Sequence, residues 1–229
     1  IGFILILFCL VGVIITGERS NGLKVLIGLL IFIFVIDYVK LKNKLFIFIA
    51  ILTIFFFMIN YSDYVKYRYV DQFYSKIKTQ DERENFLNNS LYIKLYKSGI
   101  YVFKNSPWFG VGNKNFRVET CDPKKNELYE EYHCSTHPHQ VYIEMLSEHG
   151  IIGTIIILSI IFYLAFRILR KIIQGRNYIQ AGCLIFLLIN FTPILPSGSF
   201  FNNFNITLFM INFSLMYAVN KETNIFQKK

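Results

Sequence analysis

Charged residues are scarce in this sequence, and acidic ones are fewer than basic ones. Asp, Glu, Lys and Arg make up 17% of the 229 residues, whereas 54% are hydrophobic and the mean hydropathy is +0.41. So little charge excludes a soluble domain of this size and indicates several membrane spans. Much of the net charge of +9 lies in short segments between apolar runs, which indicates membrane topology and excludes a nucleic-acid-binding surface.

The sequence also lacks an initiator Met, and it opens inside an apolar run that extends from Ile1 to Thr16. In the sequence given, this run is not preceded by the basic residues typical of a signal peptide. We therefore expect the chain to be the C-terminal portion of a longer protein.

Cysteine is sparse, and its four positions do not form a zinc pattern. Cys9 and Cys183 lie in apolar runs, and only Cys121 and Cys134 lie in a polar segment. A disulfide between the last two is expected if that segment is extracytoplasmic, and two free thiols are the alternative. A metal site formed by these Cys and the nearby His residues matches no common zinc spacing, so we expect neither a metal nor a cofactor.

Six apolar runs have close to the roughly 20 residues that a helix needs to cross a bilayer. They cover residues 1–16, 23–39, 45–60, 151–169, 178–193 and 204–219. The expected fold class is therefore an all-α multi-pass membrane protein, in contact with membrane lipids on most of its surface.

Basic residues gather in segments 40–44, 167–176 and 221–229. The positive-inside rule places these segments, and with them the C-terminus, in the cytoplasm. Alternation of the spans then places the large segment after residue 60 on the other side. The predicted organisation is three spans in 1–60, a loop domain in 61–150 and three spans in 151–229.

Within the loop domain, apolar and aromatic residues recur at the spacing of a helix. They are Tyr92, Leu95, Tyr96, Gly99, Ile100 and Phe103. This pattern predicts an amphipathic helix that packs on the domain or rests at the membrane interface. The sequence Asn105-Ser106-Pro107 is expected to end it.

A second helix is expected to start near Thr136 or His137, because Pro138 suits a first helical turn, and to run into the span at Ile151. His139 would then lie in its first turn. There the unpaired N–H groups and the helix dipole disfavour imidazolium and leave a neutral ring that accepts a proton. His139 is therefore a candidate general base.

A polar stripe follows His139 on the same predicted helix. It consists of Gln140, Glu144, Ser147 and Glu148. Gln140 and Glu144 are candidate substrate contacts, and a solvated interfacial face is the alternative interpretation.

Two arginines are candidates for binding an anionic substrate. Arg19 lies in the short, predicted extracytoplasmic loop Gly17-Glu18-Arg19-Ser20, and its planar guanidinium suits phosphate oxygens. The alternatives are an ion pair with Glu18 or a lipid headgroup. Arg117 is the second candidate, with a surface role as its alternative. The turn at 196–203 is expected on the same side, where it forms a cavity rim or anchors aromatic rings at the interface.

Four segments resemble the O-antigen ligase family, which includes O-antigen polymerases and some protein O-oligosaccharyltransferases. His139-Gln140, nine intervening residues and then Gly150-Ile151-Ile152-Gly153 resemble its signature of His, a small polar amide or Ser, and a distal Gly-x-x-Gly. Residues 105–117 resemble the segment before this signature, residues 17–20 the Arg-bearing loop, and residues 196–203 the late turn. The resemblance covers most of the chain, without the family's N-terminal helices.

This resemblance implies a multi-pass enzyme of the bacterial inner membrane whose large loop is periplasmic. It implies transfer of a glycan from undecaprenyl pyrophosphate, without metal or nucleotide sugar, to lipid A-core or another hydroxyl acceptor. Carried over by position, His139 would activate the acceptor, and Arg19 would bind the donor pyrophosphate and stabilise the leaving charge.

One departure from the family pattern concerns a second arginine. Relatives often carry Arg where this chain has Tyr92. Arg83, Lys94 or Arg117 are the candidates to replace it.

Other functions compete with that of a ligase. A polymerase or a protein O-oligosaccharyltransferase would use the same donor. A non-catalytic transporter of lipid-linked sugars should place ionisable groups at mid-membrane depth, and the predicted spans hold few of them. A structural or sensor protein predicts that His139 is dispensable.

Overall fold

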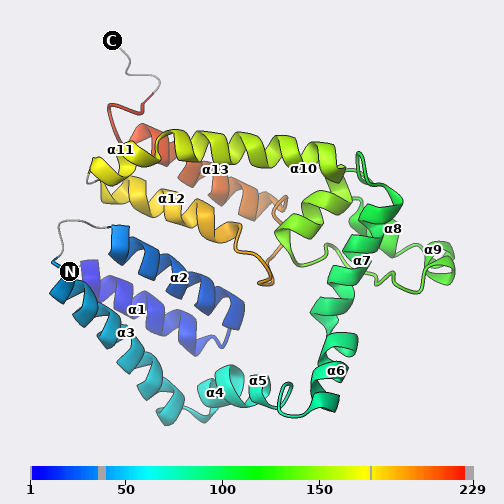
Figure 1. Ribbon diagram of the computed structural model, residues 1–229, viewed down its shortest axis with the longest axis horizontal. Coiled ribbons are helices and arrows are strands. Elements are labelled where there is room, and N and C mark those ends of the chain that lie inside the picture. The colour runs from blue at the N-terminus through cyan, green and yellow to red at the C-terminus, as the bar shows by residue number, and fades with distance from the viewer. Residues whose placement is uncertain (1, 36–39, 176, 225–229) are drawn as a thin grey trace. The chain divides into compact units, whose positions relative to one another are not determined.

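All regular elements in the described residues, which are 2–35, 40–175 and 177–224, are helices, as the computed structural model in Figure 1 shows. The predicted all-α class is thus confirmed for these residues. The chain forms two compact units, Ile1–Phe86 and Leu87–Lys229.

The first unit is formed by three apolar helices and a chain of short helical turns. The elements are α1 (Gly2–Ile15), α2 (Arg19–Val35), α3 (Leu41–Tyr61), α4 (Asp63–Lys66), the π-helical turn η1 (Tyr67–Asp71) and α5 (Gln72–Tyr74). Leu10, Ile14, Ile51 and Val65 form its buried core. Helix α6 (Gln80–Asn89) starts in this unit and ends in the second.

The short loop between α1 and α2 differs from its prediction at Arg19, which is the first residue of α2 and not a loop residue. The helix starts there because the Glu18 carbonyl already accepts a hydrogen bond from the Gly22 N–H at 2.8 Å. Two side chains that follow α3 in the chain form hydrogen bonds with the backbone of this loop. The Tyr64 hydroxyl donates to the Thr16 carbonyl, and Arg68 Nε donates to the Gly17 carbonyl, both at 3.2 Å.

The second unit contains the remaining helices. They are α7 (Leu91–Asn105), α8 (Phe116–Thr120), α9 (Pro123–Leu128), α10 (Val141–Arg167), α11 (Leu169–Gln174), α12 (Tyr178–Asn190) and α13 (Asn203–Ala218). Helix α7 packs on α10, and α12 packs on α13. Figure 1 shows α7 crossing the end of the long helix α10.

Two helical stretches in the described part of the chain are long and apolar enough to cross a membrane, by length and composition. They are Leu41–Tyr61 and Val141–Gln174, with 21 and 34 residues. The other four predicted spans correspond to α1, α2, α12 and α13, which have 14, 17, 13 and 16 residues. The count of six spans therefore stays a prediction. The span ends predicted at Ile1 and at 36–39, and the basic residues Arg176, Lys228 and Lys229, lie outside the described residues.

The long helix α10 is broken at Gly150, whose φ of 63° and ψ of −172° are not helical. The turn that follows α7 fills this break. Val111 and Gly112 donate their N–H groups to the carbonyls of Ser147 and Glu148 at 3.0 and 2.8 Å. The carbonyls of Pro107 and Trp108 accept from the N–H groups after the break, at 2.8 and 3.3 Å. Backbone groups that a straight helix would pair internally are thus paired by a separate turn.

Glycine is required on both sides of this contact. A Cβ on Gly150 would lie 2.4 Å from the backbone of Trp108, and a Cβ on Gly110 would lie 2.4 Å from the backbone of Glu148. Both glycines also have φ above +60°, which L-residues rarely adopt. The Gly-rich segments that carried the family resemblance therefore form one backbone-to-backbone contact.

A disulfide joins Cys121 and Cys134, with their Cα atoms 4.4 Å apart. It ties the end of α8 to the segment that leads to His139. Val102, Phe116 and Tyr132 form the core beneath it. Cys9 and Cys183 are free thiols.

Candidate functional site

His139 lies in an irregular segment directly before α10, with a positive φ of 58°. The Ser197 N–H, from the loop between α12 and α13, donates to the His139 carbonyl at 2.8 Å. A non-glycine residue in this conformation is unfavourable and persists only where the surroundings fix it. The hydrogen bond from Ser197 is one contact that fixes it.

The predicted start of this helix is wrong, because α10 begins at Val141 and not near Thr136 or His137. Gln140 is the N-cap residue, and its side-chain oxygen accepts a hydrogen bond from the Ile143 N–H at 2.9 Å. The cap is supplied by Gln140, so Pro138 lies outside the helix. His139 therefore precedes the first turn.

The ring of His139 contacts two other aromatic rings. The His137 ring lies 4.0 Å away between centroids, and the Tyr92 ring packs edge-on at 5.7 Å. Burial lowers the pKa of His139 below its ordinary value of 6.5. Burial, together with the neighbouring His139, lowers the pKa of His137 to about 4. Both imidazoles are therefore uncharged at neutral pH. The main cause is burial, and not the first helical turn in which the sequence placed His139.

The polar stripe after His139 is buried, so the interpretation as a solvated face is wrong. Gln140 is 4% exposed, and Glu144 and Glu148 are each 1% exposed. The Glu144 carboxylate accepts hydrogen bonds from the Ser199 hydroxyl and from the Phe200 N–H, the latter at 2.8 Å. Local sequence could not indicate this, because both donors lie more than 50 residues away in the chain.

Glu148 holds a second segment in the same way. Its carboxylate accepts the Lys114 N–H at 2.9 Å. Lys114 Nζ in turn donates to the Asn203 side-chain oxygen at 3.2 Å. The buried carboxylates thus join the turn after α7 and the turn before α13 to the first half of α10.

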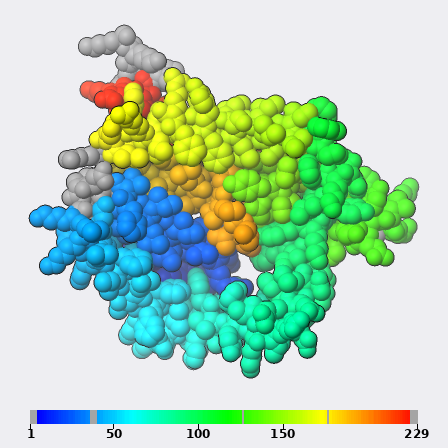
Figure 2. All heavy atoms as spheres, in the orientation of Figure 1, coloured from blue at the N-terminus to red at the C-terminus, as the bar shows by residue number. Residues whose placement is uncertain are grey.

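The late turn at 193–203 is fixed against this site along its length. Tyr96 donates its hydroxyl to the Ile194 carbonyl at 3.1 Å, and Asn205 Nδ2 donates to the Ser199 carbonyl at 2.7 Å. Figure 2 shows this segment, in orange, packed against the residues around the start of α10. The structure thus brings His139, Gln140 and Glu144 together with this turn.

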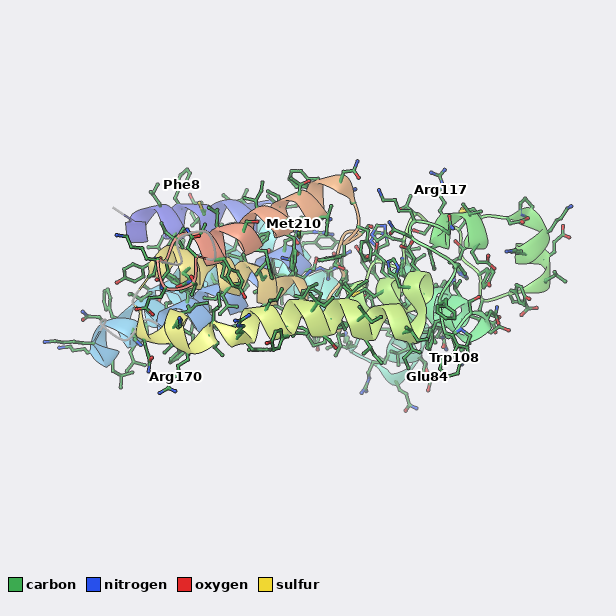
Figure 3. The ribbon with its side chains drawn as sticks, turned by 90° about the horizontal axis from the view of Figure 1, so that it is seen from above. Phe8, Glu84, Trp108, Arg117, Arg170 and Met210 are labelled. Atoms are coloured by element: carbon green, nitrogen blue, oxygen red, sulfur yellow. A yellow bond between two sulfur atoms is a disulfide. The ribbon has the colours of Figure 1, made fainter. Side chains whose placement is uncertain are left out.

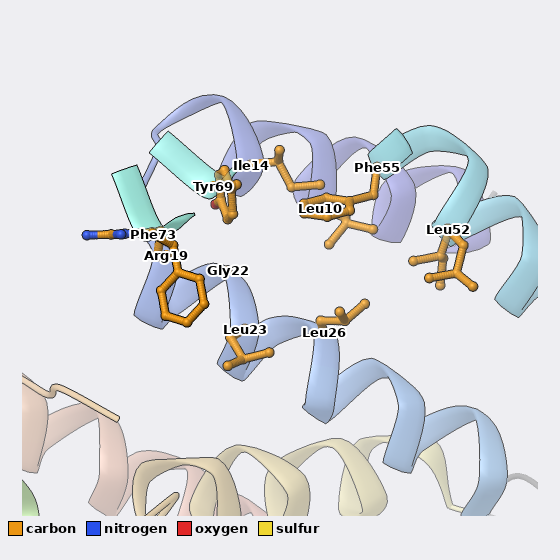
Figure 4. A pocket seen from close by; sticks show the side chains of 11 residues that line it. Leu10, Ile14, Arg19, Gly22, Leu23, Leu26, Leu52, Phe55, Tyr69 and Phe73 are labelled. Carbon is orange, nitrogen blue, oxygen red and sulfur yellow. The ribbon is translucent and has the colours of Figure 1, made fainter. Parts of the chain in front are cut away.

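Arg19 belongs to the first unit, where it lies at one end of a cavity of about 280 Å³. The cavity is otherwise lined mainly by apolar side chains from α1, α2, α3 and α5. They are Leu10, Ile14, Leu23, Leu26, Ile51, Leu52, Phe55 and Phe73. Figure 4 shows the Arg19 guanidinium directed away from this apolar lining. Since Arg19 and His139 belong to different units, a cavity shared by them stays a prediction.

Two polar groups accompany Arg19. The Tyr69 hydroxyl is buried and has no hydrogen-bond partner among the described residues, and Tyr69 also lines the cavity. Gly22 leaves room for it, since a Cβ there would lie 2.7 Å from this hydroxyl. Arg68 binds the loop before Arg19 and donates from Nη1 to Gln72 Oε1 at 3.0 Å. Sequence analysis missed both residues, although they lie in the aromatic and basic run after α3.

The other basic candidates are in different settings. Arg117 lies exposed on α8, and Figure 3 shows it projecting from the surface. Arg83 donates to the carbonyl of Thr79 at 3.3 Å, at the start of its own helix. Tyr92, which stands where relatives often carry the second arginine, is the ring packed on His139. Within the described ranges, no three His, Cys, Asp or Glu side chains are placed to hold a metal ion.

A comparison with known protein families matches the part of the chain that contains these segments. The family described as O-antigen ligase matches residues 4–158, which is more than half of the chain. The match includes Arg19, the turn after α7 and the segment from His139 to Gly153. No curated protein and no solved structure matches the chain.

Members of the matched family are membrane-embedded, glycosyltransferase-like enzymes. The chain belongs to the O-antigen ligase family. This family acts in lipopolysaccharide biosynthesis and uses a lipid-linked glycan donor and a lipid acceptor.

Proposed function

We propose that the protein transfers a glycan from undecaprenyl pyrophosphate to a hydroxyl of lipid A-core at the periplasmic face of the bacterial inner membrane. The observation that carries this proposal is the setting of His139. Its imidazole is neutral, and its backbone has a strained, positive φ. A hydrogen bond from the Ser197 N–H, in the loop between α12 and α13, holds this backbone in place.

In this proposal His139 is the general base. A ring nitrogen takes the proton of the acceptor hydroxyl while the hydroxyl oxygen bonds to the anomeric carbon of the donor sugar. The bond from that carbon to the pyrophosphate oxygen breaks, and its electron pair leaves with undecaprenyl pyrophosphate. The imidazolium then loses its proton to water. A base whose pKa lies below neutral is deprotonated and ready at the start of each cycle.

Arg19 is the proposed contact of the donor pyrophosphate. Its guanidinium lies at the end of an apolar cavity, an arrangement that suits a phosphate attached to a hydrocarbon chain. The cation would stabilise negative charge as the pyrophosphate departs. Arg68 and Tyr69 would support the same phosphate contact from beside the loop.

The remaining candidates have secondary roles in the proposal. Arg117 is exposed and would contact anionic groups of the acceptor. Gln140 and Glu144 are buried and bonded within the protein. A direct substrate contact by either residue stays a prediction.

The first experiment incubates the purified protein with a glycan on undecaprenyl pyrophosphate and with lipid A-core, and identifies products by mass spectrometry. His139→Gln keeps the size of the side chain but removes the base. His133→Gln is the matched control, because it removes an imidazole of the same irregular segment, whose Nδ1 is buried without a hydrogen-bond partner in the described structure. We expect glycosylated lipid A-core from the native protein and the control, and none from His139→Gln.

The other outcomes contradict specific parts of the proposal. Full activity in His139→Gln excludes this residue as the base. Longer glycan on the lipid carrier indicates a polymerase, and no product at all favours a transporter or sensor. For Arg19→Lys, loss of the bidentate fork should lower turnover. Unchanged kinetics relative to a control at the exposed Arg170 of α11, Arg170→Lys, would exclude the phosphate contact.

A further inference from the structure

An exposed aromatic pair lies in the turn that fills the break in α10. Trp108 is 64% exposed and Phe109 is 74% exposed. Trp108 is the single Trp of the chain. The proposed reaction gives this pair no role.

The pair is held in one place relative to α10. The residues around it make four backbone hydrogen bonds to the two sides of the break at Gly150. Gly110 and Gly150 bring the two backbones into direct contact. The backbone of this turn therefore cannot move away from α10 without breaking these hydrogen bonds.

The surface beside the pair is apolar along the helix. Ile151, Ile152, Ile155 and Ile156 are all exposed, and they follow the break on the part of α10 that is apolar enough to cross a membrane. The exposed aromatic pair and the exposed isoleucines therefore form neighbouring parts of an apolar surface at the start of the candidate span in α10. Figure 3 shows Trp108 at the edge of the molecule beside the end of α10.

The chain segment that contains the pair carries basic side chains and no acidic ones, and the Glu148 carboxylate that accepts the Lys114 N–H is buried. From residue 104 to residue 117 the chain carries Lys104, Lys114 and Arg117, and it carries no Asp or Glu. Lys104 lies exposed in the last turn of α7, just before the pair. Of these basic residues, the exposed Lys104 beside the pair suits the phosphates of lipid headgroups. Indole also prefers the boundary between headgroups and acyl chains, because its ring is apolar and its N–H is a donor.

We infer that the turn at Pro107–Gly110 is inserted into the bilayer interface and anchors the loop domain there. The occupant of the aromatic surface is the headgroup region of the lipid leaflet into which α10 enters. The anchor would fix the depth of the first half of α10, and with it the depth of the segment that carries His139.

The test uses Trp108 as its own probe and needs no catalytic activity. The native protein is reconstituted in vesicles of phosphatidylcholine brominated either near the headgroup end of the acyl chains or near their far end. We expect bromine near the headgroup to remove most of the Trp fluorescence and bromine near the far end to remove much less. Iodide in the water should have little effect.

A matched control moves the probe to another exposed apolar position in the same unit. Leu128 is 74% exposed and lies at the end of α9, which Figures 1 and 3 show beyond the end of α10. In the double variant Trp108→Phe, Leu128→Trp, iodide should quench and brominated lipid should not.

Three outcomes would overturn the inference. One is quenching of Trp108 by iodide without quenching by either lipid, and another is equal quenching in both proteins. The third is protection of Trp108 from both quenchers together with crosslinking between copies, which would assign the surface to a protein interface. Each of these results leaves the proposed transfer reaction untouched.

Discussion

Replacing Gly150 by Ala should destabilise the protein strongly, because two independent effects act at this position. The backbone has φ 63° and ψ −172°, a region almost restricted to glycine, so an L-residue there adds strain of about 1–3 kcal/mol. The new Cβ would also lie 2.4 Å from the Trp108 carbonyl carbon and oxygen. Backbone atoms cannot rotate away as a flexible side chain does, so the turn must move.

The displaced turn would lose hydrogen bonds as well. Its carbonyls at Pro107 and Trp108 accept from the N–H groups of Ile151 and Ile152, and each lost bond contributes about 0.5–1.5 kcal/mol. Strain and lost bonds together give a destabilisation of about 2–6 kcal/mol. Gly182→Ala is the control, because no heavy atom lies within 4 Å of its Cβ position in α12. Alanine there should be neutral or stabilising by about 1 kcal/mol.

The assay uses the two free thiols. Cys9 is exposed and Cys183 is buried, so in a Cys9→Ser background a fluorogenic maleimide reports the unfolding that exposes Cys183. On heating in detergent micelles, the Gly150→Ala protein should react at a clearly lower temperature than its parent, and Gly182→Ala should not. If the Gly150→Ala protein reacts at the same temperature as the control, the interlocked turn contributes nothing to stability and this reasoning fails.

Three further predictions concern the site. Glu144→Leu should lower both activity and thermal stability more than Glu144→Gln, since the amide oxygen still accepts a hydrogen bond. Equal losses in the two variants would show that the hydrogen bonds of Glu144 to Ser199 and Phe200 do not hold the site together. Because burial lowers the pKa of His139, the base stays deprotonated in mild acid. The acid limb of the pH–rate profile should therefore lie below pH 6.5, and a limb at or above that value would oppose its assignment. The double variant Cys121→Ser, Cys134→Ser removes a disulfide between residues 13 positions apart. The lost restraint on the unfolded chain should lower the stability of the folded protein by about 3 kcal/mol. A melting temperature of the native protein that dithiothreitol does not change would refute this.

Periodicity predicted the helical elements well, because it depends only on neighbouring residues. The expected helix from Tyr92 to Phe103 is confirmed as α7, and it ends at Asn105 as the following Ser-Pro predicted. Its buried face keeps Leu95 and Gly99 of the predicted pattern and is shifted toward Ser98 and Val102. The reason is close packing, since a Cβ on Gly99 would lie 2.4 Å from Ile143 of α10.

The sequence also predicted His139 as a candidate base, but not how it is held. Pro138 indicated a helix start four or five residues too early, because the cap provided by Gln140 was not foreseen. The stripe at Glu144 and Glu148 has ordinary amphipathic spacing, which does not distinguish a solvated face from a buried one. The deciding partners, Ser199 and Lys114, lie in other segments of the chain.

The first unit illustrates the same limit. The resemblance pointed to Arg19, whereas Arg68 and Tyr69 became apparent only through their contacts with the α1–α2 loop and the cavity. Their contacts join residues about 50 positions apart. Local patterns contain no information on such pairs.

The link between His139 and Ser197 has a consequence for the order in which the protein matures. The ribosome delivers the chain from its N-terminus, so every residue of the segment shared with the family, 4–158, exists before Ser197 is made. Until the loop after α12 arrives, nothing braces the Glu144 carboxylate or the His139 backbone from that side. A nascent chain therefore carries its histidine in an unassembled segment, and the contacts around it become complete only when the loop between α12 and α13 has been made. Synthesis itself delays activity until the whole unit is in place.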